Sequence, residues 1–379
     1  MSGDSAGHVA RSTAAPGSGA AARTRVRRFL RTADGVAVDA LYEPGAAGEG
    51  VAAGHPGDPS GTSDVDHVFV IAHGFTGDLD RPHVRRAARA FARHGAVVTF
   101  SFRGHGASGG RSTVGDREVL DLAAAVAWAR GFGHARVTTV GFSMGGSVVL
   151  RHAALYGGPG GEAGTAGGAL YGGPGREAGR AGKAATDATD ATDATDATDA
   201  TDATDATDAT DATDAADAAG RAEAREGASA TEAARAGARE EAAGSPGADA
   251  RTDAVISVSA PARWYYRGTA PMRRLHWLVM RPTGRLVGRW GLRTRIHHRE
   301  WDPVPLSPVA AAARIAPVPL LIVHGDRDAY FPLDHPRMLA AAAGDHGELW
   351  LEPGMGHAEN AAPDPLLDRM ARWAIAQAG

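Results

Sequence analysis

The sequence contains no cysteine, which excludes disulfide bonds, thiolate metal sites and a cysteine nucleophile. Lysine is nearly absent too: Lys183 is the single lysine, so almost all of the 40 basic residues are arginine. No apolar run approaches the roughly 20 residues that a membrane-spanning helix needs. Residues 1–22 are rich in Ser, Gly and Ala without the apolar segment of a secretory signal. We therefore expect a disordered tail over residues 1–22 and a cytoplasmic protein.

A long low-complexity stretch, residues 157–253, is dominated by Ala, Gly, Thr, Asp and Glu. It includes ten consecutive Ala-Thr-Asp triplets at 185–214 and carries 20 acidic and 8 basic residues. A three-residue period gives neither a helix nor a strand a consistent apolar face, so a disordered acidic insertion is expected. It is either a repeat expansion tolerated in a surface loop or an acidic interaction segment. The remaining parts, 23–156 and 254–379, suffice for one α/β domain.

Strand and helix patterns alternate along these two parts. Residues 67–72 form a continuous apolar run, as expected for a strand that is buried on both faces. Further strands are predicted at 25–30, 36–42, 96–102, 136–141, 254–259, 319–324 and 348–351. Helices are predicted at 81–94, 116–130, 143–156, 333–343 and 363–377. This alternation predicts a parallel sheet that is covered by helices on both faces.

The turn after the 136–141 strand has the pattern G-x-S-x-G, as Gly141-Phe142-Ser143-Met144-Gly145. A strand that turns abruptly into a helix strains the backbone of the turn residue, and small neighbours are needed on either side. The hydroxyl of Ser143 would then project from the edge of the sheet. The amide of Met144 would lie at the helix N-terminus, where unpaired donors and the helix dipole favour an anion. Ser143 is the candidate nucleophile.

A serine hydroxyl needs a base to take its proton, and the base needs an orienting carboxylate. In this architecture the three groups follow in the order Ser, acid, His. Asp328 follows the 319–324 strand and is the preferred acid. Asp326 is the alternative, although it more readily holds the loop by accepting backbone N–H groups. His357 follows the last strand and is the candidate base.

An oxyanion hole needs two N–H donors, and we expect them to be the amides of Met144 and Phe75. His73 is interpreted as a structural residue of the Phe75 loop. His105 faces the same rim and is the alternative second base. The remaining histidines, including the His297-His298 pair, lack partners at metal-ligand spacing. We therefore predict no metal and no cofactor.

Five motifs together resemble the α/β-hydrolase superfamily, and more narrowly its serine esterases and monoacylglycerol-lipase-like enzymes. In chain order they are H-G-F at 73–75, R-G-H-G-x-S at 103–108, G-F-S-M-G-G at 141–146, H-G-D-x-D-x-x-x-P at 324–332 and G-H at 356–357. The resemblance covers 25–156 and 254–377. It implies a mostly parallel sheet of about eight strands, with a helical cap.

The resemblance also implies roles for individual residues. They are Ser143 as nucleophile, Asp328 as acid, His357 as base, and Phe75 and Met144 as oxyanion donors. A serine at the nucleophile position, where some relatives have aspartate, argues against epoxide hydrolase and haloalkane dehalogenase chemistry. Ser101 stands where relatives often have aspartate, so the attachment of the following loop is expected to differ.

The cap implied by the resemblance covers residues 261–305, with two short amphipathic helices at about 271–280 and 283–290. It contains six aromatic residues, and ten arginines against Glu300 and Asp302. One interpretation is an apolar acyl pocket with a cationic rim, suited to anionic or amphiphilic substrates or to a lipid surface. The other is that the arginine stems pack on the cap with their charged groups in water. The acidic insertion could also dock on this basic cap.

The predicted function is that of a serine hydrolase, which cleaves a small-molecule carboxylic ester or thioester through an acyl-enzyme. No nucleic acid partner is expected. The alternatives that would use the same three residues, Ser143, His357 and Asp328, are acyl transfer, perhydrolase chemistry and C–C bond hydrolysis. A non-catalytic binding module on the same fold is the alternative from a different class. Substrate identity and oligomeric state are not specified by these patterns.

Overall fold

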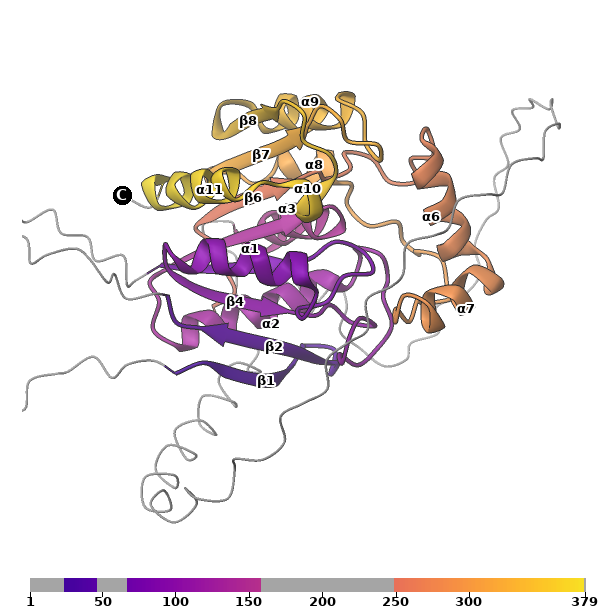
Figure 1. The fold of residues 1–379 in the computed structure, drawn as a ribbon, viewed down its shortest axis with the longest axis horizontal. Coiled ribbons are helices and arrows are strands. Elements are labelled where there is room, and N and C mark those ends of the chain that lie inside the picture. The colour runs from indigo at the N-terminus through magenta and orange to yellow at the C-terminus, as the bar shows by residue number, and fades with distance from the viewer. Residues whose placement is uncertain (1–23, 46–66, 158–248, 378–379) are drawn as a thin grey trace, which may run out of the picture. The chain divides into compact units, whose positions relative to one another are not determined.

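The computed structural model describes residues 24–45, 67–157 and 249–377 (Figure 1). The predicted tail, residues 1–22, lies outside the described residues. Of the predicted insertion, residues 157–253, only residue 157 and residues 249–253 are described.

The described residues form one eight-stranded sheet with the order β1-β2-β4-β3-β5-β6-β7-β8. β1 pairs antiparallel with β2, and β2 antiparallel with β4, whereas all other neighbours are parallel. This confirms the predicted sheet of about eight strands, mostly parallel. In chain order the strands are β1 (Val26–Arg31), β2 (Ala37–Glu43), β3 (His67–Ala72), β4 (Ala96–Phe100), β5 (Arg136–Phe142), β6 (Ala254–Val258), β7 (Leu320–Gly325) and β8 (Gly347–Glu352).

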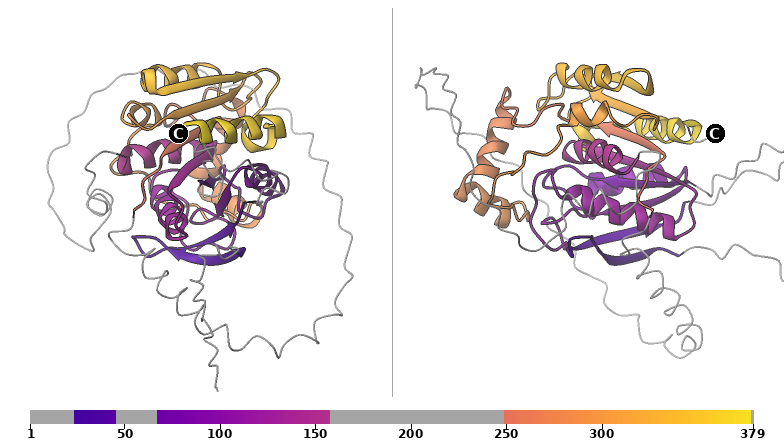
Figure 2. Two further views of the ribbon diagram at one scale, coloured as in Figure 1. Left: turned by 90° about the vertical axis from the view of Figure 1, so that its left-hand side faces the viewer. Right: turned by 180° about the vertical axis from the view of Figure 1, so that it is seen from behind.

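Helices cover both faces of the sheet (Figures 1 and 2). One face packs against α1 (Pro82–Ala92), α11 (Asp364–Gln377) and the short α10 (Ala358–Ala361). The other packs against α2 (Glu118–Gly131), α3 (Met144–Tyr156), α8 (Pro308–Ala312) and α9 (Asp334–Ala343). A short 3-10 helix, η2 (Gly344–His346), precedes β8.

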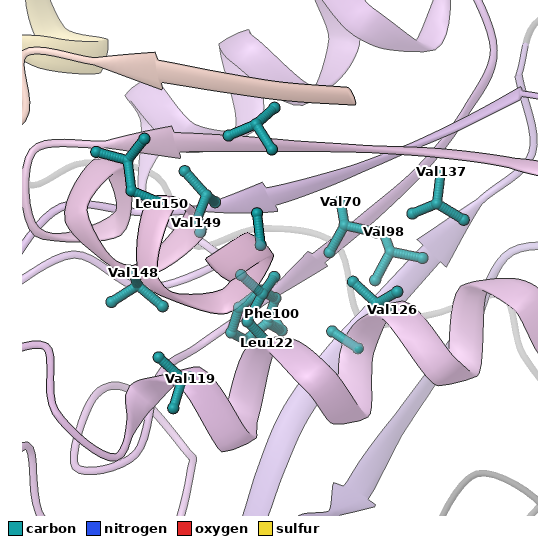
Figure 3. Close-up of a cluster of buried hydrophobic side chains, with 14 of the residues drawn as sticks. Val70, Val98, Phe100, Val119, Leu122, Val126, Val137, Val148, Val149 and Leu150 are labelled. Carbon is teal, nitrogen blue, oxygen red and sulfur yellow. The ribbon is translucent and has the colours of Figure 1, made fainter. Parts of the chain in front are cut away.

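The interior strands are buried on both faces, as their continuous apolar runs predict. Every residue of β3, β4, β6 and β7 is buried. Figure 3 shows valine, leucine and phenylalanine side chains gathered between the sheet and α2 and α3, among them Val70, Val98, Phe100, Leu122 and Val149. Burial of each such side chain stabilises the fold by about 1.5–3 kcal/mol, so the strand ends that carry the site rest on a rigid base.

Two helices follow β6: α6 (Ala270–Met280) and α7 (Pro282–Trp290). They lie within the range predicted for a helical cap and stand at one end of the sheet (Figures 1 and 2). Among the described helices, none is both long and apolar enough to cross a membrane.

Residues 249–253 are packed onto the sheet, although the expected insertion extends to residue 253. Ala250 and Thr252 are buried. The Thr252 hydroxyl donates to the Val137 carbonyl at 3.1 Å, and Asp253 forms an ion pair with Arg130 at 2.8 Å. These contacts lead the chain into β6.

Candidate active site

The turn between β5 and α3 holds Ser143 in a strained backbone conformation. Its φ is 52° and its ψ is −112°, outside the regions that a serine ordinarily adopts. The flanking glycines make this turn possible. A Cβ at Gly141 would clash with the carbonyl of Gly145, and a Cβ at Gly145 would clash with the carbonyl of Ala72. The close approach of these backbones explains the G-x-S-x-G spacing.

The structure brings Ser143, His357 and Asp328 together in one hydrogen-bonded row. The distance from Ser143 Oγ to His357 Nε2 is 2.9 Å, and that from His357 Nδ1 to Asp328 Oδ2 is 2.8 Å. The three residues come from the loops that follow β5, β7 and β8. Because an ionised carboxylate only accepts, His357 Nδ1 carries the proton it donates to Asp328, which leaves Nε2 free to accept from Ser143.

The Asp328 carboxylate is held by backbone and imidazole donors. Its Oδ1 accepts the N–H groups of Tyr330 at 2.8 Å and Phe331 at 3.1 Å. Burial opposes its ionisation, but the His357 hydrogen bond and the charges of His357 and His324 outweigh burial and hold the pKa of Asp328 below its usual range. The structure therefore favours a carboxylate beside His357.

Asp326, the alternative acid, points elsewhere. Its Oδ1 accepts the N–H of Gly354 at 2.7 Å, which joins the loop after β7 to the turn after β8. This is the loop-holding contact expected for Asp326.

The ring of Tyr330 stacks on His357 with centroids 4.2 Å apart and so limits the positions open to the imidazole.

The loop that carries Phe75 is held from three sides. His73 Nδ1 donates to the Gly74 carbonyl at 2.7 Å, and its Nε2 accepts the Phe102 N–H at 3.0 Å. His105 Nε2 accepts the Thr76 N–H at 3.3 Å. Glu359 Oε1 accepts the Gly74 N–H at 3.2 Å.

The two expected oxyanion donors lie on either side of the nucleophile's turn. Phe75 and Met144 both line the cavity that contains Ser143. Within the described part of the chain, neither amide N–H is taken by another acceptor.

His105 does not fit the alternative role of second base. Its Nδ1 lies 3.0 Å from the Arg103 carbonyl, and its Nε2 takes the Thr76 amide, so backbone groups occupy both ring nitrogens. Burial lowers the pKa of His105 to about 4, and burial is the largest cause that lowers the pKa of His73 to about 3. Both rings are neutral structural groups.

Glu359 and Ser259 are site residues that the sequence reasoning missed. Glu359 is buried beside the Phe75 loop, with its Oε1 also 3.6 Å from His83 Nε2. Ser259 Oγ accepts the Ala358 N–H at 3.1 Å and so holds the backbone next to His357. The only sequence signal was the position of Glu359 two residues after His357 and of Ser259 at the end of a predicted strand.

Ser101 holds the neighbouring loop with a hydroxyl and a carbonyl. Its Oγ accepts the Leu79 N–H at 3.0 Å, and its carbonyl accepts the Ser108 hydroxyl at 2.6 Å. Neutral hydroxyl and carbonyl groups of Ser101 therefore hold this loop, at the position where relatives often have an aspartate.

Two hollows meet at Ser143. The first is a cavity of about 140 Å³ between the sheet and α6, with mainly apolar walls. Its lining includes Val114, Trp264, Met272, Leu275, Val279 and Trp301. The second is an open groove on the His357 side, whose lining also includes the polar side chains Arg81, His83, Arg274, Glu359 and Asn360. The hydroxyl of Ser143 thus lies between an apolar cavity and a groove that offers polar groups beside apolar ones.

No cluster of three or more His, Asp or Glu side chains within residues 24–45, 67–157 and 249–377 is arranged to hold a metal ion. His297 and His298 stack on each other with centroids 5.1 Å apart.

A family model described as the alpha/beta hydrolase fold matches residues 67–160. The described residues have the α/β-hydrolase fold, and this match supports the resemblance to the α/β-hydrolase superfamily. Among solved structures, this α/β-hydrolase chain is similar to the Pyrococcus furiosus esterase Pf2001, with 16% identity and a TM-score of 0.51 over 94% of this chain and 93% of that one. It is also similar to the alpha/beta hydrolase GrgF from Penicillium sp. sh18, with 13% identity and a TM-score of 0.50 over 93% and 98% of the two chains. At these identities the similarity concerns the fold. No curated protein matches the sequence.

Proposed function

We propose that this α/β-hydrolase cleaves a carboxylic ester or thioester through a serine-bound acyl intermediate. The observation that carries the proposal is the row Ser143–His357–Asp328, with contacts of 2.9 and 2.8 Å, at a strained strand-to-helix turn. A serine hydroxyl at ordinary pH is a weak nucleophile, and such a row is the arrangement that activates it.

In the proposed reaction, His357 Nε2 takes the Ser143 proton while Oγ attacks the substrate carbonyl. The oxyanion that forms is stabilised by the N–H groups of Phe75 and Met144. His357 then gives its proton to the departing alcohol or thiol, which leaves an acyl ester on Ser143. A water molecule, deprotonated by His357, attacks this ester and releases the acid and the free serine. Asp328 holds the imidazole in the required tautomer and stabilises its charged form.

The two hollows beside Ser143 suggest how a substrate would bind. An apolar acyl group fits the cavity lined by Trp264, Met272 and Trp301. The leaving group would then lie in the groove beside His83, Glu359 and Asn360, where hydroxyl or charged groups find hydrogen-bond partners. We therefore propose an amphiphilic substrate with an apolar acyl chain and a polar leaving group.

Turnover of p-nitrophenyl esters and acyl thioesters of increasing chain length tests the proposal. We expect Ser143→Ala and His357→Ala each to lower kcat by about 10⁴-fold or more. Asp326→Asn serves as the matched control, because Asp326 holds the same loop without contacting His357. An alcohol or peroxide added to the assay separates hydrolysis from acyl transfer by the products. Turnover that survives Ser143→Ala would refute the proposal.

A further inference from the structure

The second cap helix packs with its small residues inward and its large residues outward. In α7, only Gly284 and Gly288 are buried. A Cβ at Gly284 would clash with the α6 backbone at Trp277, so this glycine permits the close approach of the two helices. Leu286, Val287 and Trp290 are 57%, 49% and 76% exposed. This is the reverse of an ordinary surface helix, whose apolar side chains face the core.

The neighbouring helix extends the same kind of surface. Trp277 and Met280 of α6 are also exposed, at 48% and 37%. Large apolar side chains gathered on adjacent helices are uncommon on a monomer's surface and mark a site of interaction. We call the five residues Trp277, Met280, Leu286, Val287 and Trp290 the cap face.

The charge of the segment that carries the cap face is strongly positive. Residues 263–299 contain ten arginines and no Asp or Glu. Among the described residues, Arg263 is the only one of these ten that forms an ion pair, with Asp334 at 2.6 Å. The Arg289 guanidinium lies over the Trp290 ring, 5.3 Å from its centroid, so cation and aromatic ring are presented together. Within the described part of the chain, no acidic side chain pairs with the other nine arginines.

We propose that the cap face binds the surface of a bilayer that contains anionic phospholipid. Helices that lie in a membrane interface combine tryptophan and aliphatic side chains, which enter the acyl boundary, with arginines that contact the headgroups. Both features occur here on the same two short helices. A nucleic acid would use the arginines and Trp290 but would leave Leu286 and Val287 without a partner.

The position of the cap face connects it to the site. Met272 and Leu275 of α6 line both hollows beside Ser143, and Trp277 of the cap face lines the open groove. A bilayer on the cap face would therefore lie next to the entrance through which an amphiphilic ester would reach Ser143. This connection rests on the proposed function, whereas lipid binding itself does not.

Co-sedimentation of the full chain with phosphatidylcholine vesicles, with and without phosphatidylglycerol, tests the proposal. We expect binding to the anionic vesicles at low salt and weaker binding at high salt, because salt screens the arginines. Leu286→Ser/Trp290→Ser and Arg281→Glu/Arg289→Glu should each lower the partition coefficient by at least about tenfold. None of these four residues lines either hollow beside Ser143.

The controls remove similar groups elsewhere on the surface. Phe29→Ser deletes an exposed apolar side chain of β1, and Arg337→Glu reverses an exposed charge of α9. Both should bind vesicles like the wild type, and the thermal unfolding midpoint of every variant should match it. No binding to anionic vesicles, or equal loss in variants and controls, would overturn the proposal. So would binding to a single-stranded oligonucleotide that needs Arg281 and Arg289 but not Leu286. Because no turnover is measured, these outcomes are independent of the proposed hydrolysis.

Discussion

Replacement of Glu359 tests how the Phe75 loop is held for catalysis. Glu359 is 4% exposed, and its Oε1 accepts the Gly74 N–H at 3.2 Å, next to the residue whose amide is the expected oxyanion donor. The side chain thus joins the turn after His357 to the Phe75 loop. Glu359→Ala leaves the Gly74 N–H without this acceptor, a local cost of about 1–3 kcal/mol. Glu359→Gln keeps a carbonyl oxygen in the same place.

Complete loss of one oxyanion donor costs about 10²- to 10³-fold in kcat, so a displaced donor should cost less. We expect Glu359→Ala to lower kcat for ester hydrolysis by about 10- to 100-fold. Glu359→Gln should stay within about threefold of the wild type.

Steady-state assays near neutral pH measure this difference, and Asp368→Ala removes a surface carboxylate that pairs with Arg93 as a control. Wild-type kcat in Glu359→Ala would refute the reasoning. An equal loss of kcat in Glu359→Gln and Glu359→Ala would show that the negative charge of Glu359 matters rather than its role as a hydrogen-bond acceptor.

Three further variants probe other contacts. Asp328→Asn should lower kcat by about 10³- to 10⁴-fold while Asp326→Asn keeps most activity, and equal losses would contradict the assignment of the acid. Gly145→Ala should yield little folded protein by circular dichroism, because its Cβ would overlap the Ala72 carbonyl; a wild-type melting curve would contradict this. His152 is buried on α3, and burial lowers its pKa to about 3. The unfolded chain takes up a proton below pH about 6.5 while the folded ring stays neutral, so stability is full above that pH and falls as the pH drops. His152→Phe should therefore reduce the slope of unfolding free energy against pH by about 1.4 kcal/mol per unit between pH 6 and 4, and an unchanged slope in urea titrations would contradict the burial argument.

The parts of the fold that depend on neighbours in the chain could be predicted from the sequence. The apolar run at 67–72 has the length and composition of a strand buried on both faces, and β3 has those bounds. The G-x-S-x-G spacing reflects backbone contacts within one turn, between Gly141 and Gly145. The positions of Asp328 and His357 after their strands were sufficient to propose both residues, because parallel strands end at the same edge of a sheet.

Contacts between distant segments could not be predicted in this way. Glu359 and Gly74 are separated by 285 positions, and no local pattern links them. The cap was implied by the family resemblance, and its two amphipathic helices were expected to turn their apolar side toward the site. In α7, Gly284 and Gly288 face inward instead, because the α6 backbone lies against Gly284 and the Ile296 side chain lies against Gly288. Residues 249–253, which composition assigned to the insertion, are held by contacts of Thr252 with β5 and of Asp253 with α2, and composition gives no sign of these contacts.

Labelling with a fluorophosphonate tests the central claim most directly. The reagent bonds covalently to a serine only where a base and an oxyanion site activate the hydroxyl. Intact mass and peptide mapping of the full chain should show one adduct on Ser143, and both Ser143→Ala and His357→Ala should abolish it. A folded protein that takes up no label, or that is labelled equally in the His357→Ala variant, would contradict an activated serine at this site.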